Sequence, residues 1–489
     1  MGYNRKIGGI PAKGDPVRIA LIHYHLRRGG VTSVLYNQAN ALIEAGDEAL
    51  IISGEPNLDD KRLPQAGVEE LRYDQFARDS GAKEEAIPRK AEILANNIIA
   101  AMKAHWGGPA DILHVHNPMI RKNAALLSAL EILRKRGLRL LLQNHDLSED
   151  FRPDVYVGDE EYPENCHYSV INKRDYSFLH RAGLKTEGLH LLPNEVRPIN
   201  VSQGLERKRY LYPVRAIRRK NIGEALLLSL FIPAGRTVAI TLPPISEKEI
   251  PVYRRWVDFA REMELPVEFD VGLQESLSDT YGSALGIITT SVKEGFGFSF
   301  LEPWTAGRAV IGRRIHYVCR DFENADVRFK TFYSSLDIPR VYISTSILRK
   351  KMEETMTSIY RSFGQEPPRY VLSMIGEELL SRDTVDFGRL DEATQAGIIQ
   401  VVNFNRTVYR DMADANPFLA GLADWQADEE LIEENCRTVL ANYGREQISK
   451  MLKGIYKSVI HNQVVHKISK NILLELYLDP LRLSLIGAQ

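Results

Sequence analysis

The chain contains 489 residues, with 63 Lys and Arg against 64 Asp and Glu, so its formal net charge at pH 7 is −1. This length is too great for one ordinary hydrophobic core and favours two domains with extensions. The balanced charge excludes the strongly basic composition of most nucleic-acid-binding proteins, so we expect no nucleic-acid partner.

Three features of the sequence favour a cytoplasmic protein. The cysteines, Cys166, Cys319 and Cys436, are few and far apart, which indicates a reducing compartment and argues against a disulfide framework or a zinc knuckle. Residues 1–14 lack the apolar segment of a signal peptide. No run of about 18 apolar residues is found, so we expect no transmembrane segment.

In the first part of the chain, short apolar runs alternate with amphipathic helical patterns. Strands are predicted at residues 17–25, 48–53, 112–116, 138–143, 167–172 and 190–192. Helices are predicted at residues 31–45, 90–105 and 122–135. This alternation is typical of a doubly wound, mostly parallel sheet, so we predict a Rossmann-like domain over residues 1–195.

A second α/β series follows a polar linker at residues 193–208. Its strands are predicted at 210–212, 237–242, 267–271, 285–291 and 309–311, and its helices at 220–229, 247–263 and 276–283. Beyond about residue 317 the patterns are mainly helical, with helices at 346–363, 391–403, 429–443, 446–460 and 468–476. We predict a second Rossmann-like domain over 205–425 with a helical insertion at about 320–403, and C-terminal helices over 426–489.

Residues 294–302, EGFGFSFLE, connect the predicted strand 285–291 to a helical pattern that ends at Gly307. At such a turn, backbone N–H groups and the positive end of the helix dipole suit a phosphate. Glu294 and Glu302, eight positions apart, could hold the hydroxyls of a sugar or a ribose. These features predict a site for a nucleotide-linked sugar. An acid/base pair for glycoside hydrolysis is the weaker alternative, because the carboxylates flank a Gly-rich turn after a Rossmann-type strand.

Two cations, Arg215 and Lys220, are predicted where a strand gives way to a helix. Cations at a helix N-terminus oppose the dipole, and a bound diphosphate would offset this. The alternative is a solvated basic run, because Arg218 and Arg219 lie between them.

Two adjacent glycines, Gly29 and Gly30, follow the first predicted strand. Glycine lets the backbone approach a ligand closely, so this loop is a second candidate for donor binding. The alternative is a plain turn between a strand and a helix.

Histidines are concentrated at predicted strand ends. His23 and His25, like His114 and His116, are two apart and therefore project from one face of a strand. Such pairs can ligate zinc, so a metal-dependent hydrolase is an alternative function, although no Asp or Glu completes a recognisable ligand set. Hydrogen-bonded histidines of the core or crevice are the simpler explanation. His145, at another strand end, is the better candidate for a ligand-binding crevice.

The sequence contains no Asp-x-Asp motif, which a transferase that binds diphosphate through a divalent metal would usually carry. We therefore expect neither a catalytic metal nor another cofactor. The diphosphate of the donor would be met by Arg215, Lys220 and backbone amides.

Together these motifs resemble the retaining glycosyltransferases of family 4. The matching features are Glu294 to Glu302 (Glu-x7-Glu) with the strand after Gly307, Arg215 and Lys220 (Arg-x4-Lys), Gly29-Gly30, Pro193-Asn194, and Glu434-Asn435 with the helices through Tyr456. The resemblance covers roughly residues 17–315 and 430–460. It implies the GT-B architecture, in which two Rossmann-like domains face across a cleft. The first domain would bind the acceptor, the second the nucleotide sugar, and the C-terminal helices would cross back to the first domain.

The resemblance also implies a role for each motif residue. Glu302 would hold the ribose hydroxyls, Glu294 the hydroxyls of the donor sugar, and His145 would lie near the transferred sugar. The departing phosphate would take the acceptor proton, so transfer with retention needs charge stabilisation and positioning but no enzymic nucleophile. The expected catalytic residues are His145, Glu294, Arg215 and Lys220. The expected donor-binding residues are Gly29, Gly30, Arg215, Lys220, Glu294, Gly297, Phe298, Ser299 and Glu302.

The chain departs from the family pattern at several points. Glu195 stands where the family often has Gly, and Ala309 where it often has Pro. Residues 237–244 lack the Gly that the family usually has after this strand. This difference affects the part of the expected site that binds the base of the nucleotide. The region from about 320 to 403 is longer than the family pattern.

The expected acceptor is a small, hydrophilic and anionic molecule. Arg27, Arg28, Arg121, Lys122 and Arg152 fall in loops of the first domain, where they could bind a carboxylate or a phosphate. Scattered surface cations are the alternative explanation.

A retaining hexosyltransferase is the leading hypothesis. A non-catalytic sugar-nucleotide-binding protein is a further alternative, and a homo-oligomeric state is left open.

Overall fold

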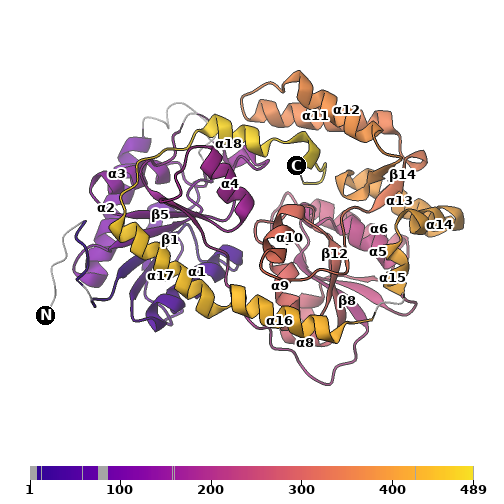
Figure 1. The fold of residues 1–489 in the computed structure, drawn as a ribbon, viewed down its shortest axis with the longest axis horizontal. Coiled ribbons are helices and arrows are strands. Elements are labelled where there is room, and N and C mark those ends of the chain that lie inside the picture. Colours follow the sequence, from indigo (N-terminus) through magenta and orange to yellow (C-terminus); the bar gives the residue numbers. More distant parts are fainter. Residues whose placement is uncertain are drawn as a thin grey trace. The chain divides into compact units, whose positions relative to one another are not determined.

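The computed structural model describes residues 8–12, 14–57, 59–74, 86–156, 158, 160–423 and 426–487. The chain divides into two compact units (Figure 1). The first contains Met1–Glu195 and Tyr443–Leu478, and the second contains Val196–Asn442 and Asp479–Gln489. Each unit is therefore built from two separate segments of the chain.

The first unit contains a parallel sheet with the strand order β3-β2-β1-β4-β5-β6-β7. The strands are β1 (Arg18–His23), β2 (Glu48–Ser53), β3 (Gln65–Gly67), β4 (Ile112–His116), β5 (Leu140–Asn144), β6 (His167–Val170) and β7 (Leu189–Leu191). Every residue of β4 and β5 is buried, as expected for a parallel sheet that is covered on both faces.

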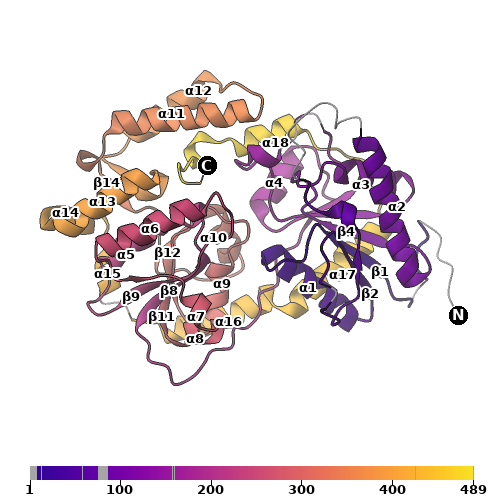
Figure 2. The same cartoon turned by 180° about the vertical axis from the view of Figure 1, so that it is seen from behind.

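Helices cover both faces of this sheet. Ala20 and Ile22 belong to one core and Ile19 and Leu21 to the other, because successive strand residues point to opposite faces. The core with Ile19 includes α1 (Gly30–Glu44) and α17 (Arg445–His461). The core with Ala20 includes α2 (Ile87–Trp106), α3 (Leu126–Lys135), α4 (Lys173–Arg181) and α18 (Lys470–Tyr477). Figure 2 shows α2 and α3 packed against each other on this side. The described residues of this unit also form the 3-10 helices η1 (Glu69–Leu71) and η3 (Pro153–Val155).

The second unit contains a parallel sheet with the order β10-β9-β8-β11-β12-β13. The strands are β8 (Arg209–Arg215), β9 (Thr237–Leu242), β10 (Val267–Glu268), β11 (Ala284–Thr289), β12 (Val310–Arg313) and β13 (Phe332–Tyr333). The elements that alternate with them are η4 (Arg218–Lys220), α5 (Ile222–Ser229), α6 (Ile250–Glu262), α7 (Val271–Gln274), α8 (Leu277–Gly282), α9 (Phe298–Thr305) and α10 (His316–Glu323).

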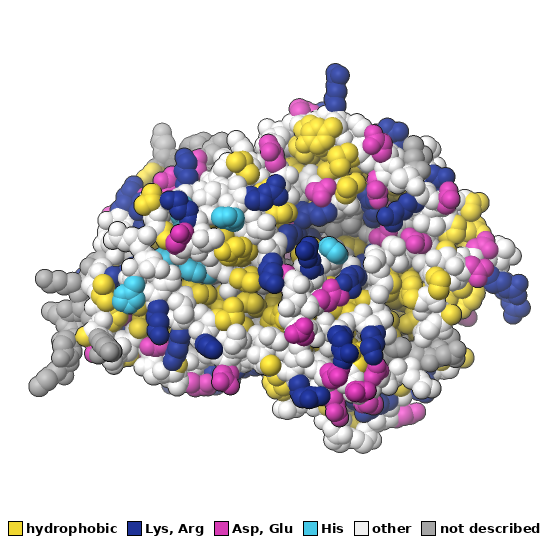
Figure 3. Space-filling view, viewed as in Figure 1, with side chains coloured by type: hydrophobic (Ala, Val, Ile, Leu, Met, Phe, Trp, Pro, Cys, Tyr) yellow, Lys and Arg dark blue, Asp and Glu magenta, His cyan; other side chains and the backbone are white. Residues whose placement is uncertain are grey.

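The rest of the second unit is mainly helical. A two-stranded antiparallel sheet pairs β14 (Asp337–Pro339) with β15 (Thr384–Asp386). The helices are α11 (Thr345–Ser362), α12 (Arg369–Leu380), α13 (Glu392–Phe404), α14 (Arg406–Ala415), α15 (Phe418–Ala423) and α16 (Glu429–Tyr443), with the 3-10 helices η5 (Arg340–Tyr342), η6 (Phe387–Arg389) and η7 (Pro480–Arg482). On the face seen in Figure 3, apolar side chains gather over α11 and α12, where Ile347 and Tyr370 are exposed.

The prediction of two Rossmann-like α/β domains with a helical C-terminal region is confirmed. Some predicted bounds differ from the structure. The helix predicted to begin at Lys220 begins at Ile222, because Asn221 has a left-handed backbone (φ 52°) that interrupts the helical run. The helix expected from residue 122 begins at Leu126. No helix in the described part of the chain is long and apolar enough to cross a membrane.

The boundaries of the two units differ from the predicted domain boundaries. Residues 426–442, predicted as part of the C-terminal helices, belong to the second unit. Asp479–Gln489 belong to it as well, and the segment between them, Tyr443–Leu478, belongs to the first unit.

Candidate functional site

The candidate donor site lies in the second unit, at the carboxyl ends of two neighbouring strands. β8 ends at Arg215 and is followed by η4, and β11 ends at Thr289 and is followed by the turn that carries Glu294. Parallel strands that pair side by side end at the same edge of the sheet, which is where α/β folds bind ligands. The topology thus brings the cationic loop and the Gly-rich turn together.

Glu294 is held between two cations, and its side chain is only 7% exposed. The ammonium group of Lys220 donates to Oε1, and Arg219 Nη1 donates to Oε2 at 2.8 Å. Burial alone would raise the pKa of Glu294, but the positive charges of Lys220 and Arg219 outweigh it and lower this pKa to about 2. Burial lowers the pKa of Lys220, and the charge of Glu294 opposes this shift. With all three groups ionised, the cluster has one positive charge in excess.

Two residues with separate expected roles contact each other in the structure. Lys220 is expected to bind the diphosphate and Glu294 the sugar hydroxyls, and their side chains form an ion pair. Arg219, which lies in the basic run between Arg215 and Lys220, contributes to the same cluster. Arg215 is engaged elsewhere, because its Nη1 donates to the carbonyl of Pro243 at 2.8 Å.

Hydrogen bonds fix the backbone on both sides of this cluster. The hydroxyls of Tyr212 and Thr290 donate to the carbonyl of Lys220 at 2.7 and 3.0 Å. The hydroxyl of Tyr317, on α10, donates to the carbonyl of Glu294 at 2.6 Å. The ionic contacts therefore sit on a rigid frame.

Gly297 forms the end of the Gly-rich turn and is the N-cap of α9. Its φ of +91° is in a region that L side chains rarely adopt, and a Cβ there would lie 2.5 Å from the ring of Phe300. The fold therefore requires glycine at this position. Phe298 and Ser299 form the first turn of α9, and Ser299 Oγ lies 3.5 Å from the hydroxyl of Thr289.

Glu302 has the opposite electrostatic character to Glu294. It lies on α9, and burial raises its pKa to about 7. Close to neutral pH it exists both as a carboxylic acid and as a carboxylate. The two motif glutamates thus differ in charge, although they share one turn and one short helix.

In the first unit, His145 belongs to a cluster of buried imidazoles. Nδ1 of His116 lies 3.0 Å from Nε2 of His145, and the two rings are stacked at an interplanar angle of 11°. His114 also stacks with His116, and it contacts the hydroxyl of Tyr456 at 2.8 Å. Burial lowers the pKa of His145 to about 4 and that of His114 to about 3, so both are neutral at pH 7.

His114 and His116 both belong to β4, but β1 ends at His23, so His25 lies beyond the strand and the prediction of a common strand face is wrong for the first pair. The ring centroids of His23 and His25 are 5.2 Å apart, and those of His114 and His116 are 4.6 Å apart. Within the described residues, however, no group of three or more His, Cys, Asp or Glu side chains is arranged to hold a metal ion. The geometry is that of hydrogen-bonded, neutral histidines.

Gly29 and Gly30 lie at the start of α1, with Gly29 as its N-cap. The backbone of Gly29 is extended, and a Cβ would find nothing closer than 3.9 Å there and nothing within 4 Å at Gly30. The fold itself therefore does not require glycine at these positions, unlike at Gly297.

Cations from three loops of the first unit gather around Tyr73, which the sequence pattern did not single out. The ammonium group of Lys122 lies 5.5 Å from the centre of its ring. Burial raises the pKa of Tyr73, while the nearby charges of Arg152 and Arg27 act in the opposite direction. The Tyr73 hydroxyl also contacts Nε2 of His25 at 3.0 Å.

The expected acceptor-binding cations differ in their surroundings. Arg27 makes a bidentate ion pair with Glu55, and Arg152 lies 3.3 Å from Asp146. Arg28 is exposed. Arg121 donates its backbone N–H to the carbonyl of Val155 at 2.9 Å. In the described part of the chain, its buried Nε has no hydrogen-bond partner.

One departure from the family pattern has a structural explanation. Glu195 is buried and lies 3.5 Å from Arg445 of α17, which also pairs with Glu44 of α1. A carboxylate at position 195 thus ties α17 to the first segment of its unit. Ala309, next to β12, is buried.

Comparison with known proteins places this geometry in a wider context. No protein-family model matches the sequence. Over 417 residues the chain is 25% identical to mannosylglucosyl-3-phosphoglycerate synthase of Petrotoga mobilis, covering 76% of this chain and 78% of that protein.

Solved structures share the fold. A glycosyltransferase from Rickettsia africae superimposes with a TM-score of 0.52 at 13% identity, covering 92% of this chain and 100% of that one. Sucrose-phosphate synthase from Thermosynechococcus elongatus superimposes with a TM-score of 0.52 at 15% identity, covering 90% and 98%. Neither alternative function is favoured by these comparisons. The chain has the GT-B fold, and its sequence relationship supports a glycosyltransferase.

Proposed function

We propose that the chain is a metal-independent, retaining glycosyltransferase of family 4 that moves a hexose from a nucleotide-diphosphate sugar to a small anionic acceptor in the cytoplasm. The observation that carries this proposal is the cluster of the buried Glu294 with Lys220 and the partly exposed Arg219 at the carboxyl ends of β8 and β11. Its excess positive charge suits a diphosphate.

Donor binding would use both the cations and the carboxylate of this cluster. The diphosphate would approach Lys220 and Arg219, while Glu294 keeps both cations in place and presents a carboxylate to the sugar hydroxyls. The amides of Gly297, Phe298 and Ser299 would add dipoles at the start of α9. Glu302 would accept hydrogen bonds from the ribose hydroxyls in its ionised form.

Transfer would depend on stabilising charge on the leaving group. As the bond between the sugar and the phosphate breaks, negative charge grows on the diphosphate, and fixed cations in a site of low dielectric stabilise that charge. The departing phosphate oxygen would take the proton of the acceptor hydroxyl on the same face of the sugar, which retains the anomeric configuration. His145, a neutral imidazole, would position a sugar hydroxyl by hydrogen bonding.

An anionic acceptor is supported by two independent observations. The relative from Petrotoga mobilis is named for a product that contains 3-phosphoglycerate. In this chain, Arg27, Lys122 and Arg152 surround Tyr73, where a carboxylate or phosphate could displace the pairings with nearby carboxylates.

A thermal-shift screen followed by a transfer assay tests this function. UDP-, GDP- and ADP-linked glucose and mannose are screened first. The stabilising donor is then offered to 3-phosphoglycerate, glycerate and glycerol, with and without EDTA. We expect stabilisation by one nucleotide series, transfer to an anion in preference to glycerol, and activity in EDTA. NMR spectroscopy of the product should show the anomeric configuration of the donor.

Substitutions then test the site. Lys220→Ala and Glu302→Ala should abolish transfer while the circular dichroism spectrum stays that of the wild type. Undiminished transfer by both variants would refute the site assignment, and a product of inverted configuration would refute the retaining mechanism.

A further inference from the structure

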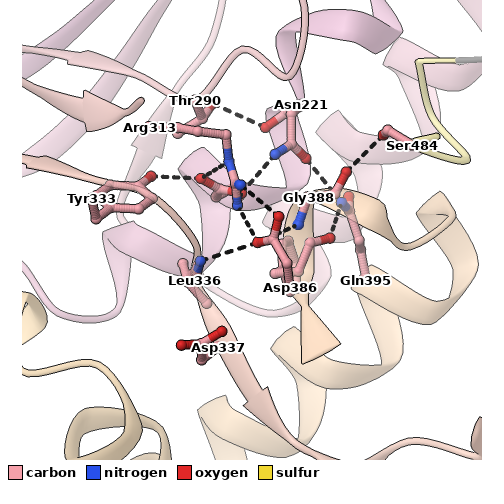
Figure 4. A network of polar contacts seen from close by, with 12 residues as sticks. Asn221, Thr290, Arg313, Tyr333, Leu336, Asp337, Asp386, Gly388, Gln395 and Ser484 are labelled. Atoms are coloured by element: carbon pink, nitrogen blue, oxygen red, sulfur yellow. Dashed lines mark hydrogen bonds and ion pairs between the residues drawn. The ribbon is translucent and has the colours of Figure 1, made fainter. Parts of the chain in front are cut away.

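A buried polar network connects the candidate donor loop to the helical segment that follows the second sheet (Figure 4). It begins at Asn221, which directly follows Lys220. Asn221 is 1% exposed and has a left-handed backbone. Asparagine tolerates this conformation better than most residues, and buried side-chain amides need partners to remain in one orientation.

Both polar atoms of the Asn221 amide are engaged. Nδ2 donates to Glu224 Oε2 at 2.7 Å, and Oδ1 accepts from Gln395 Nε2 at 2.9 Å. Gln395 lies on α13, and its Nε2 also contacts the carbonyl of Phe387 at 3.1 Å. A residue 174 positions further along the chain therefore holds the conformation of Asn221.

The same helix contacts the loop a second time. Arg218, the first residue of η4, donates from Nε to Glu392 Oε1 at 2.9 Å. Glu392 and Gln395 are three apart on α13 and thus share one face. The loop that carries Arg219 and Lys220 is accordingly held at both of its ends by α13.

A second set of contacts joins α5 to the sheet and to β15, and Asn221 links it to Gln395 of α13. Glu224 is fully buried and accepts from Arg313 Nη2 at 2.5 Å and from the Tyr333 hydroxyl at 2.5 Å. Arg313 continues to Asp386, at the end of β15, through two hydrogen bonds of 2.7 Å. A fully satisfied network of buried charges rigidifies the elements that it connects.

We infer that α13 positions the cationic loop for the diphosphate, with Gln395 and Glu392 as positioning residues. This inference rests on the proposed function of the loop. It assigns a purpose to part of the region that the sequence left unexplained. Without Gln395, the Asn221 amide loses a partner, its backbone conformation is less strongly held, and the direction of the neighbouring Lys220 side chain is no longer fixed.

Gln395→Leu tests the inference directly. The dissociation constants of UDP, GDP and ADP are measured by calorimetry for the wild type and the variant, together with KM for the donor and kcat. We expect binding of the preferred nucleoside diphosphate to weaken by about 10-fold, because a buried acceptor is left unsatisfied. KM for the donor should rise in parallel.

Val402→Ala is the matched control, because Val402 is buried on the same helix and is apolar. It should lower the melting temperature without changing nucleotide affinity. Glu392→Ala and Glu392→Gln form a second pair that does not depend on a core substitution. The alanine variant should weaken binding, and the glutamine variant, which keeps an oxygen for Arg218 Nε, should restore most of it.

The outcomes separate the two proposals. If the wild type binds none of the three nucleotides, the proposed function fails and this inference fails with it. If the wild type binds one of them and Gln395→Leu and Glu392→Ala bind it equally well, only the inference is overturned. An equal loss of affinity in Val402→Ala would also overturn it, because the effect would then follow stability alone.

Discussion

Replacing Lys220 by Met leaves Glu294 with one of its two cationic partners. In the wild type, the pKa of Glu294 falls from an ordinary 4.5 to about 2, although its side chain is only 7% exposed. Such a fall corresponds to roughly 3 kcal/mol of stability at neutral pH. Lys220 and Arg219 supply this amount together, and Arg219 remains beside Glu294 in the variant. We therefore predict a smaller loss, about 2 kcal/mol, for Lys220→Met at pH 7.

The pH dependence of this loss follows from the direction of the shift. The pKa of Glu294 is lowered by folding, so its contribution is fully present above pH 4.5 and disappears as the pH falls toward 2. Urea unfolding of both proteins, followed by circular dichroism at pH 7 and pH 3.5, should therefore show a smaller difference at the lower pH. Lys350→Met, which removes an exposed lysine of α11, is the control and should cause no measurable change at either pH. A loss for Lys220→Met below about 1 kcal/mol at pH 7, or one that does not depend on pH, would refute the reasoning.

Three further predictions follow from other parts of the second unit and from the first loop. Because burial raises the pKa of Glu302 to about 7, nucleoside-diphosphate affinity should increase from pH 6 to pH 8 as the carboxylate forms, and Glu302→Gln should remove this dependence. Gly297→Ala should cost at least about 1–2 kcal/mol, because of its positive φ and the close approach to a ring, whereas Gly30→Ala should unfold like the wild type but lose transfer activity. Arg313→Met should cost about 3–5 kcal/mol, because it removes the cationic partner of the fully buried Glu224.

Each of these predictions has a clear counter-result. Nucleotide affinity that is flat from pH 6 to pH 8 in the wild type would contradict the role of Glu302. Equal melting temperatures for Gly297→Ala and the wild type would contradict the steric argument, and full activity of Gly30→Ala would show that no ligand approaches that loop. For Arg313→Met, an unchanged urea midpoint would mean that the buried network contributes little to stability.

The alternation of strands and helices was enough to predict both sheets except for β3 and β13, because parallel strands that are buried on both faces form apolar runs that a sequence displays directly. The two missed strands are only three and two residues long. Helix α4 was missed. Its sequence, KRDYSFLHR, is mostly polar, and only Asp175 and Leu179 are buried. The start of α4 is stabilised by Asn172, whose side chain accepts a hydrogen bond from the backbone N–H of Asp175. An N-cap residue alone is weak sequence evidence for a helix when no apolar stripe follows it.

The candidate site was predictable only in part. The turn of Glu294 was identified because its glycines and carboxylates follow a strand. The contact of Arg219 with Glu294 was not predicted, because three consecutive basic residues show no periodicity that would indicate which of them contacts the glutamate. Gln395 and Tyr73 were also missed, because their contacts form between segments that are far apart in sequence. Tertiary packing determines such contacts, and local pattern does not display them.

The first unit consists of two segments separated by 247 residues of the second unit, Val196–Asn442. One face of its sheet is covered by α17, whose Leu452 and Tyr456 share a core with Leu21. During synthesis, α1 can cover only part of this face, and the part that α17 covers stays exposed until the ribosome has translated almost the whole chain. The second unit has by then emerged nearly complete, so we expect it to fold first, although N-terminal domains usually do. A ribosome that stalls after residue 442 would therefore release a chain with an exposed apolar sheet, which is a substrate for chaperones and proteases.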